Sequence, residues 1–280
     1  MTYIQCLLIS IAQGLTEFLP VSSSAHIVIV NALYKFFTHK DLAGNSCEEI
    51  FFAIIIHLGT LIAVLLYFKN DIIKIIKDFF SIFKTKKLEN EDQKLSLYIL
   101  LGTVVTVVFC FPLKDIVENI MKEPYITSIF LVGTGFILFF AEYLSQKNKN
   151  NPDNLSWKKS ALIGLSQGMA IFPGFSRSGL TIATGLMLGL DRVKAAKFSF
   201  LLSIPIIIGA SVFYPILEID FAQLQTFNVK ALIMGFWVSF VVGYLCIKYF
   251  MKFLGKYSLK VFAYYCLCIG IITFILFKFF

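Results

Sequence analysis

The sequence predicts an all-α integral membrane protein with six transmembrane helices, two re-entrant helical hairpins and an inverted-topology repeat of two halves. Its hydrophobic content is 58% and its mean hydropathy is +0.80, whereas soluble domains are roughly 45–50% apolar. Six windows of 17 to 20 residues contain no Asp, Glu, Lys or Arg. Two further apolar segments, one in each half of the chain, are interrupted by proline and glycine.

The six charge-free windows are long enough to form the predicted spans. As helices, stretches of this length cross the roughly 30 Å of hydrocarbon in a bilayer. The windows are Ile50–Phe68, Leu95–Leu113, Pro124–Ala141, Phe198–Leu217, Ala231–Ile247 and Val261–Phe277.

The lysines predict how these spans are oriented. Three loops are rich in lysine: Lys69–Lys94 with seven, and Ser145–Lys159 and Lys248–Lys260 with four each. The loops Lys114–Glu123 and Glu218–Asn228 have no such excess. Because lysine-rich loops stay in the cytoplasm, we expect both termini outside, and each interrupted segment must then enter and leave the membrane on one side.

The two interrupted segments are therefore predicted to be re-entrant hairpins, at about 3–37 and 160–190. Glu17 is the one charged residue among the first 34 positions, and Arg177 is the one charged residue of the second segment. Inverted repeats place their site at such broken helices, near the bilayer midplane. We accordingly divide a single membrane domain into halves 1–150 and 151–280, with the polar stretch Gln146–Asn154 as the linker.

The net charge is +8. Lysines in the cytoplasmic loops of a membrane protein account for this charge, so we expect no nucleic-acid partner. The six cysteines include no C-x-x-C pair and no companion histidine cluster, so we expect neither a disulfide nor a zinc site. The N-terminus has no basic region and no small-residue cleavage site, and we do not interpret it as a signal peptide.

The first hairpin gathers a carboxylate, hydroxyls and an imidazole around Pro20. Gln13 and Glu17 are four residues apart and share one face of a helix. After the proline, the run Ser22–Ser24 supplies residues that prefer helix N-caps. His26 follows on the face that Ser22 and Ser23 share. A helix N-terminus with free N–H groups is an anion site that commonly binds phosphate.

The second hairpin repeats this pattern with a cation. Pro173 and Gly174 break the segment, and Ser176, Arg177 and Ser178 open the next half-helix, with Thr181 one turn later. The planar guanidinium is suited to phosphate oxygens.

The two breaks together predict phosphoryl transfer. Glu17 fits a ligand of a divalent cation, since Mg²⁺ is typically held by one or two carboxylates plus substrate oxygens. His26 titrates near neutrality and suits acid–base or nucleophilic work.

Simpler roles remain open for several of these side chains. One alternative is that Glu17 and Arg177 form an ion pair whose only role is to join the two halves. A hydroxyl in a membrane helix often bonds to its own backbone, which applies to Ser24, Ser178 and Thr184. His57, in the first span, is more often a structural than a catalytic histidine.

Two motifs resemble those of the BacA-type undecaprenyl-diphosphate phosphatases, also called bacitracin resistance proteins. Residues 13–26, QGLTEFLPVSSSAH, resemble the family's (E/Q)-x-x-x-E element followed by its Pro-x-Ser-Ser stretch and histidine. Residues 173–181, PGFSRSGLT, resemble the motif P-G-x-S-R-S-x-x-T, and residues 198–205 look like the family's fourth span. The resemblance covers the chain end to end.

This resemblance implies hydrolysis of undecaprenyl diphosphate to undecaprenyl phosphate and inorganic phosphate, which recycles a carrier lipid for cell-wall synthesis and confers bacitracin resistance. It implies dependence on Mg²⁺ or Ca²⁺, a multi-pass location in the bacterial cytoplasmic (inner) membrane, and an active site open to the outer face.

The resemblance also implies roles for matching residues. The functional positions of the family fall on Glu17, His26, Ser23, Arg177, Ser176 and Thr181. We expect Glu17, His26, Arg177 and Ser23 to be catalytic, and Ser22, Ser176, Ser178 and Thr181 to bind substrate, while Glu17 and Gln13 hold the metal. Three positions depart from the family pattern: Gln13 replaces a common glutamate, Ala25 a common glycine, and Ala53 a frequent acid.

A polyprenyl-phosphate transporter or flippase is the alternative function, since opposed re-entrant hairpins are transporter architecture. His26 near Glu17 favours the enzyme, because an anion carrier needs neither a metal carboxylate nor an acid–base group. Gly133 and Gly135 would pack spans or subunits together, so a homodimer is one candidate assembly.

Overall fold

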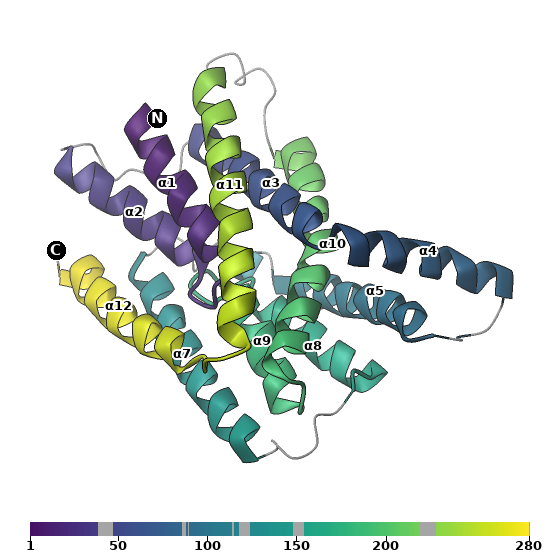
Figure 1. Cartoon of the computed structure of the whole chain (residues 1–280). Coiled ribbons are helices and arrows are strands. Elements are labelled where there is room, and N and C mark those ends of the chain that lie inside the picture. The colour runs from purple at the N-terminus through teal and green to yellow at the C-terminus, as the bar shows by residue number, and fades with distance from the viewer. Residues whose placement is uncertain are drawn as a thin grey trace.

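The computed structural model describes residues 1–38, 47–85, 88, 90–113, 115–117, 124–147, 154–218 and 228–279. The described residues are predominantly α-helical, and an isolated β-bridge joins Pro173 to Phe175. The α-helices labelled in Figure 1 are α1 (Tyr3–Thr16), α2 (Ser23–Phe37), α3 (Cys47–Tyr67), α4 (Lys69–Thr85), α5 (Glu91–Cys110), α7 (Pro124–Lys147), α8 (Trp157–Met169), α9 (Arg177–Met187), α10 (Arg192–Glu218), α11 (Val229–Leu254) and α12 (Lys260–Phe279). The short 3₁₀ helix η1 (Phe111–Leu113) follows α5.

Six helices within the described ranges are long and apolar enough to cross a membrane, which confirms the six predicted spans. They cover Glu48–Tyr67, Glu91–Leu113, Pro124–Gln146, Arg192–Val212, Val229–Leu254 and Lys260–Phe279. The protein is therefore a multi-pass membrane protein.

The lysine-rich segment after the first span is not the simple loop that the sequence predicted. Residues 69–85 form α4, which continues from α3 with only a short irregularity, because Phe68 N–H donates to Val64 O and Ile72 N–H donates to Phe68 O. The lysines of this segment obscured the helical spacing of its apolar residues. Lys74 forms an ion pair with Asp92, and this hydrogen bond and charge raise the pKa of the lysine.

Two helices are broken inside the protein. The chain leaves helical geometry between α1 and α2 and again between α8 and α9. The four helices contain 14, 15, 13 and 11 residues. At 1.5 Å per residue, even the 15-residue helix is only about 22 Å long, which is too short to cross the hydrocarbon.

The first helix of each broken pair packs against a long helix from the other half of the chain. In Figure 1, α1 lies beside α11, and α8 likewise contacts α5. Small residues permit the second contact, because a Cβ on Gly164 would lie 2.7 Å from Gly102 Cα. Thr106 Oγ1 also donates to Gly164 O across this interface (2.8 Å).

Gly133 and Gly135 pack within the chain. A Cβ on Gly133 would lie 3.1 Å from Phe175 Cε1, and one on Gly135 would lie 2.9 Å from Ala263 O. The two glycines therefore allow α7 to approach the second break and α12. Most of the predicted linker, residues 148–153, lies outside the described residues.

Candidate active site

The two breaks meet through a buried ion pair. Arg177, the first residue of α9, donates from Nη2 to Oε1 of Glu17, which follows α1, over 2.6 Å. The side chains are only 17% and 7% exposed. Since isolated charges are very unfavourable in an apolar interior, residues 160 positions apart are held together at the centre of the fold.

The second oxygen of Glu17 contacts two more of the predicted site residues. Oε2 accepts hydrogen bonds from Ser23 Oγ at 2.8 Å and from Gln13 Nε2 at 3.0 Å. His57 Nε2 lies 3.7 Å from the same oxygen. The structure thus places Gln13, Ser23 and Arg177 around one carboxylate, with His57 at its margin.

Two polar atoms beside this carboxylate are buried without a hydrogen-bond partner in the described part of the chain. They are Gln13 Oε1, an acceptor, and Arg177 Nη1, a donor. A buried polar group left unpaired costs about 1–3 kcal/mol. Unmet donor and acceptor capacity next to a charged pair indicates a site where a polar ligand belongs.

Two serines form hydrogen bonds that join the two breaks. Gly174 N–H donates to Ser24 Oγ at 3.3 Å, and Ser178 Oγ donates to Leu19 O at 2.9 Å. Ser24 and Ser178 each lie two residues after the N-cap of their helix. Each break therefore supplies a hydroxyl to the backbone of the other, which fixes the distance between them.

The predicted N-caps are confirmed at both helix starts. Ser22 Oγ accepts from Ala25 N–H at 3.3 Å, and Ser176 Oγ accepts from Gly179 N–H at 3.0 Å. Ser22 has a φ of 68°, the one positive φ among the described non-glycine residues. Such strain costs about 1–3 kcal/mol and clusters at functional sites.

The strained serine orients His26. Ser22 O lies 2.7 Å from His26 Nδ1 and also accepts from His26 N–H at 3.2 Å. A carbonyl only accepts, so Nδ1 carries the ring proton and Nε2 is an acceptor in the neutral imidazole. Nε2 lies 2.7 Å from the hydroxyl of Tyr265 on α12. The ring is therefore engaged by Ser22 and Tyr265 and not directly by the Glu17 carboxylate.

Thr181 contacts the backbone of α9 and its neighbour α10. Its hydroxyl donates to Arg177 O at 2.8 Å and lies 2.6 Å from Ser199 Oγ. Thr134 of α7 accepts from Ser176 N–H at 3.1 Å. The hydrogen bonds of Thr181 therefore stabilise the first turn of α9.

Sequence reasoning missed Tyr265, Thr134 and Ser199. Each is a common residue within a long apolar span, and its site partner lies far along the chain or on a separate element. The one available signal was a polar side chain in an apolar window, which many structural residues share.

The oxygen atoms of the Glu17 and Gln13 side chains are suitable ligands for a hard divalent cation. The described residues contain no group of three or more His, Cys, Asp or Glu side chains that would hold a metal. The Glu17 carboxylate and the unpartnered Gln13 Oε1 are nevertheless the ligand type that Mg²⁺ and Ca²⁺ prefer, and Mg²⁺ completes its shell with substrate oxygens and water.

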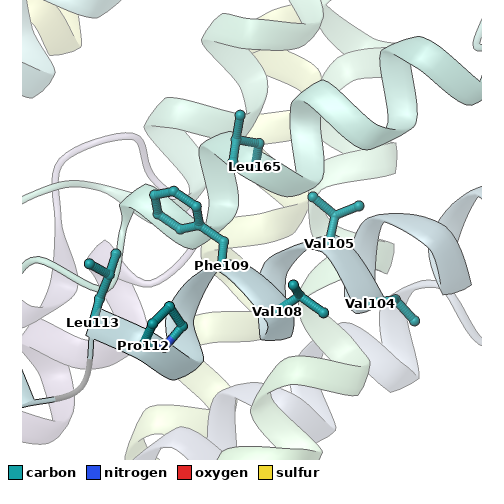
Figure 2. A pocket seen from close by; sticks show the side chains of 7 residues that line it. All are labelled: Val104, Val105, Val108, Phe109, Pro112, Leu113 and Leu165. Carbon is teal, nitrogen blue, oxygen red and sulfur yellow. The ribbon is translucent and has the colours of Figure 1, made fainter.

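A separate hollow lies between α5, η1 and α8 (Figure 2). Its volume is about 490 Å³, and its seven lining residues are all apolar: Val104, Val105, Val108, Phe109, Pro112, Leu113 and Leu165. None of these residues belongs to the charged cluster. Its apolar lining offers no charged or polar side chain to a phosphate group.

Comparison with known proteins shows the family of this chain. The family described as "Bacitracin resistance protein BacA" matches residues 6–272. An "Undecaprenyl-diphosphatase" from Methanobrevibacter smithii is 42% identical, over 98% of this chain and 97% of that protein. Proteins of the same name from Methanosphaera stadtmanae and Nitrosococcus oceani are 40% and 37% identical, over 98% and 99% of this chain and 97% and 100% of theirs. The chain belongs to the BacA family.

Proposed function

We propose that this protein is an undecaprenyl-diphosphate phosphatase, which releases inorganic phosphate and leaves undecaprenyl phosphate for another round of cell-wall synthesis. Bacitracin resistance follows from the same activity. The observation that carries the proposal is the buried Glu17–Arg177 pair, beside which Gln13 Oε1 and Arg177 Nη1 have no hydrogen-bond partner among the described residues. The names of its full-length relatives support the choice of substrate.

Arg177 and the start of α9 would bind the diphosphate. The guanidinium fork offers paired donors to phosphate oxygens, and the N–H groups of the first helical turn add a positive partial charge. Ser176 and Ser178 lie 3.2 Å apart at this helix start, and Thr181 holds the backbone of Arg177. Donors fixed in this way stabilise the charge that develops during phosphoryl transfer.

Glu17 and Gln13 would hold the divalent cation. Arg177 donates a hydrogen bond to one oxygen of Glu17. If the cation bound this carboxylate, the guanidinium would be free to bind the substrate. A bound Mg²⁺ or Ca²⁺ would supply charge neutralisation on the phosphate oxygens.

His26 and Ser23 are the two candidates for activating or performing the attack. Ser23 Oγ donates to Glu17 Oε2, so the carboxylate is placed to accept its proton if the serine is the nucleophile. His26 Nε2 is an acceptor that Tyr265 holds in place, so it is suited to act as the base for water or as the nucleophile. Ser22 fixes the orientation of His26 in either case.

The arrangement of the chain supports re-entrant hairpins at α1–α2 and α8–α9, related as an inverted repeat of halves 1–150 and 151–280. Each of the four helices is by itself too short to span, and the first helix of each pair packs on the opposite half. We infer that the protein lies in the bacterial cytoplasmic membrane with both termini outside and the charged cluster open to the outer face. The lysine-rich ends of the spans support this orientation.

The second candidate function is that of a polyprenyl-phosphate flippase. The observation in its favour is that hydrogen bonds of Ser24 and Ser178 join the two breaks. Transporters place broken helices of opposite orientation around one midplane site. Such a carrier would bind the lipid phosphate and move it without releasing inorganic phosphate.

The test is release of inorganic phosphate from undecaprenyl diphosphate by the purified full-length protein in detergent. We expect release that EDTA abolishes and that added Mg²⁺ or Ca²⁺ restores. Undiminished release in EDTA would exclude the metal role of Glu17 and Gln13. Binding of the lipid phosphate by folded protein without any release would instead favour the carrier.

A further inference from the structure

The helix α4 presents a divided surface outside the candidate active site. Four large apolar side chains are exposed along it: Ile73 (51%), Ile76 (51%), Phe80 (62%) and Phe83 (68%). Their spacings of three, four and three residues place them in one stripe at 100° per residue. Four exposed aliphatic and aromatic residues in line require a partner that excludes water from them.

A basic strip runs beside the apolar stripe. Lys74, Lys77 and Lys84 are exposed, and helical geometry rotates each of them to the same side of the stripe. Beyond its first residue, Lys69, the exposed arc of α4 is thereby divided lengthwise into an apolar half and a basic half. The remaining side of the helix faces protein, where Ile72 and Ile75 pack against the hydrophobic core.

Because α4 connects two spans, its two ends are expected near the same membrane surface. The helix continues from the end of the span α3 and precedes the span α5. It is fastened to the start of α5 by the Lys74–Asp92 ion pair and by Gln93 Nε2, which donates to Ser81 Oγ at 2.8 Å. Asp71 additionally pairs with Lys197 at the start of α10 over 2.6 Å.

We propose that α4 is an interfacial helix that inserts its apolar stripe at the headgroup boundary and binds anionic phospholipid headgroups with Lys77 and Lys84. A helix with an apolar face and a lysine-lined edge lies in the interface plane, and anionic lipids strengthen its binding. The charge of the lysines selects this occupant over a neutral protein surface. The lipid chemistry is that of a phosphate diester, such as phosphatidylglycerol. This surface is distinct from the catalytic cluster and does not depend on the proposed phosphatase activity.

The first test locates the stripe by fluorescence in the full-length protein reconstituted into phosphatidylcholine vesicles. Trp157 and Trp237 are replaced by phenylalanine, and a single tryptophan is introduced as Phe80→Trp or, for the control, Asn70→Trp on the exposed basic side. We expect brominated acyl chains to quench the tryptophan at position 80 strongly and aqueous iodide to quench it weakly. The control should show the reverse preference.

Two outcomes would overturn the interfacial position. Strong iodide quenching at position 80, with no quenching by brominated lipid, would place the stripe in water. Protection of position 80 from both quenchers would mean that protein covers it, either a second copy of this chain or another partner.

The second test measures lipid selectivity by native mass spectrometry of protein from vesicles of phosphatidylglycerol and phosphatidylcholine in equal amounts. A lysine near an anionic surface contributes about a fivefold preference, so Lys77→Gln/Lys84→Gln should lower the retained phosphatidylglycerol by an order of magnitude. Lys77→Arg/Lys84→Arg, which keeps both charges, should retain it. Equal retention by the glutamine variant would overturn the anionic-lipid assignment.

Discussion

At the scale of single residues, the central feature is one carboxylate with several partners. Glu17 contacts Arg177, Ser23 and Gln13 within 3.0 Å. A pair that served only to join two halves would satisfy its own hydrogen bonds, since orphaned buried donors and acceptors are rare. The unpartnered Gln13 Oε1 and Arg177 Nη1 instead favour a ligand site.

Arg177→Lys tests whether the planar fork matters as well as the charge. Lysine keeps the positive charge but loses paired donation to phosphate. We expect kcat to fall by about 10²–10³, as when one charge-stabilising donor is removed, with the melting temperature nearly unchanged. Wild-type kcat in this variant would show that any cation suffices.

Tyr265→Phe tests the positioning of His26. The substitution removes the hydroxyl that lies 2.7 Å from His26 Nε2 and leaves the ring that stacks on the imidazole at 5.6 Å between centroids. Because one hydrogen bond contributes about 1 kcal/mol net, kcat should fall roughly fivefold at unchanged KM. An equal fall of kcat and thermal stability would indicate a structural tyrosine.

The pairing of Glu17 with Arg177 was foreseeable from sequence, whereas the role of Tyr265 was not. Two lone charges in apolar segments have few partners other than each other. Tyr265 is one of 12 tyrosines, and 239 positions separate it from His26. Only the packing of α12 against the rest of the protein brings these two residues together.

At the scale of elements, the second break depends on Gly174. Its φ is +101°, and a Cβ there would collide with the Thr127 backbone carbonyl on α7. Left-handed geometry disfavours a side chain by about 1–2 kcal/mol, and overpacking adds about 1–3 kcal/mol. Gly174→Ala should therefore lower the melting temperature in detergent and abolish activity by displacing Arg177.

Gly209→Ala is the matched control for this prediction. A Cβ on Gly209, within α10, meets no atom of the described residues within 4 Å, and alanine has the higher helix propensity. We expect stability equal to or slightly above that of the wild type. Equal stability of both variants would show that the second break tolerates a side chain.

A second buried ion pair holds the ends of three elements. Arg192 donates from Nε and Nη2 to Glu142 at 2.8 and 2.6 Å, and Leu259 N–H donates to the same carboxylate at 2.8 Å. Arg192→Ala leaves Glu142, which is fully buried, without its counter-charge. We expect a loss of about 3–5 kcal/mol, measured as a lower unfolding midpoint, while Lys194→Ala nearby should be neutral. A neutral Arg192→Ala would mean that water reaches Glu142.

The spans were predictable as elements, but α4 was not. Charge-free windows locate the spans because the hydrocarbon excludes charge over a fixed thickness. In α4, lysines alternate with apolar residues, so the segment contains no charge-free window that would have predicted a helix there. The spacing of Ile73, Ile76, Phe80 and Phe83 carried the helical signal instead.

In the whole molecule, an inverted repeat requires the two halves to have opposite orientations in the membrane. Sided labelling with a membrane-impermeant maleimide tests this on a background in which the native cysteines are replaced. Asn228→Cys, at the start of α11, should react in intact cells, because the loop before it is expected outside. Lys158→Cys, at the start of α8, should react only after the membrane is opened. Labelling of both from one side would contradict the inverted repeat.

The catalytic role of Glu17 is tested by phosphate release from undecaprenyl diphosphate by the Glu17→Gln variant, measured together with its melting temperature. Glutamine keeps the shape of the side chain and removes the charge that pairs with Arg177 and would hold the metal. An active-site carboxylate predicts a loss of activity of at least about 100-fold in a protein that still folds and inserts. Activity near that of the wild type, or a loss no larger than the loss of folded protein, would show that Glu17 and Arg177 only join the two halves.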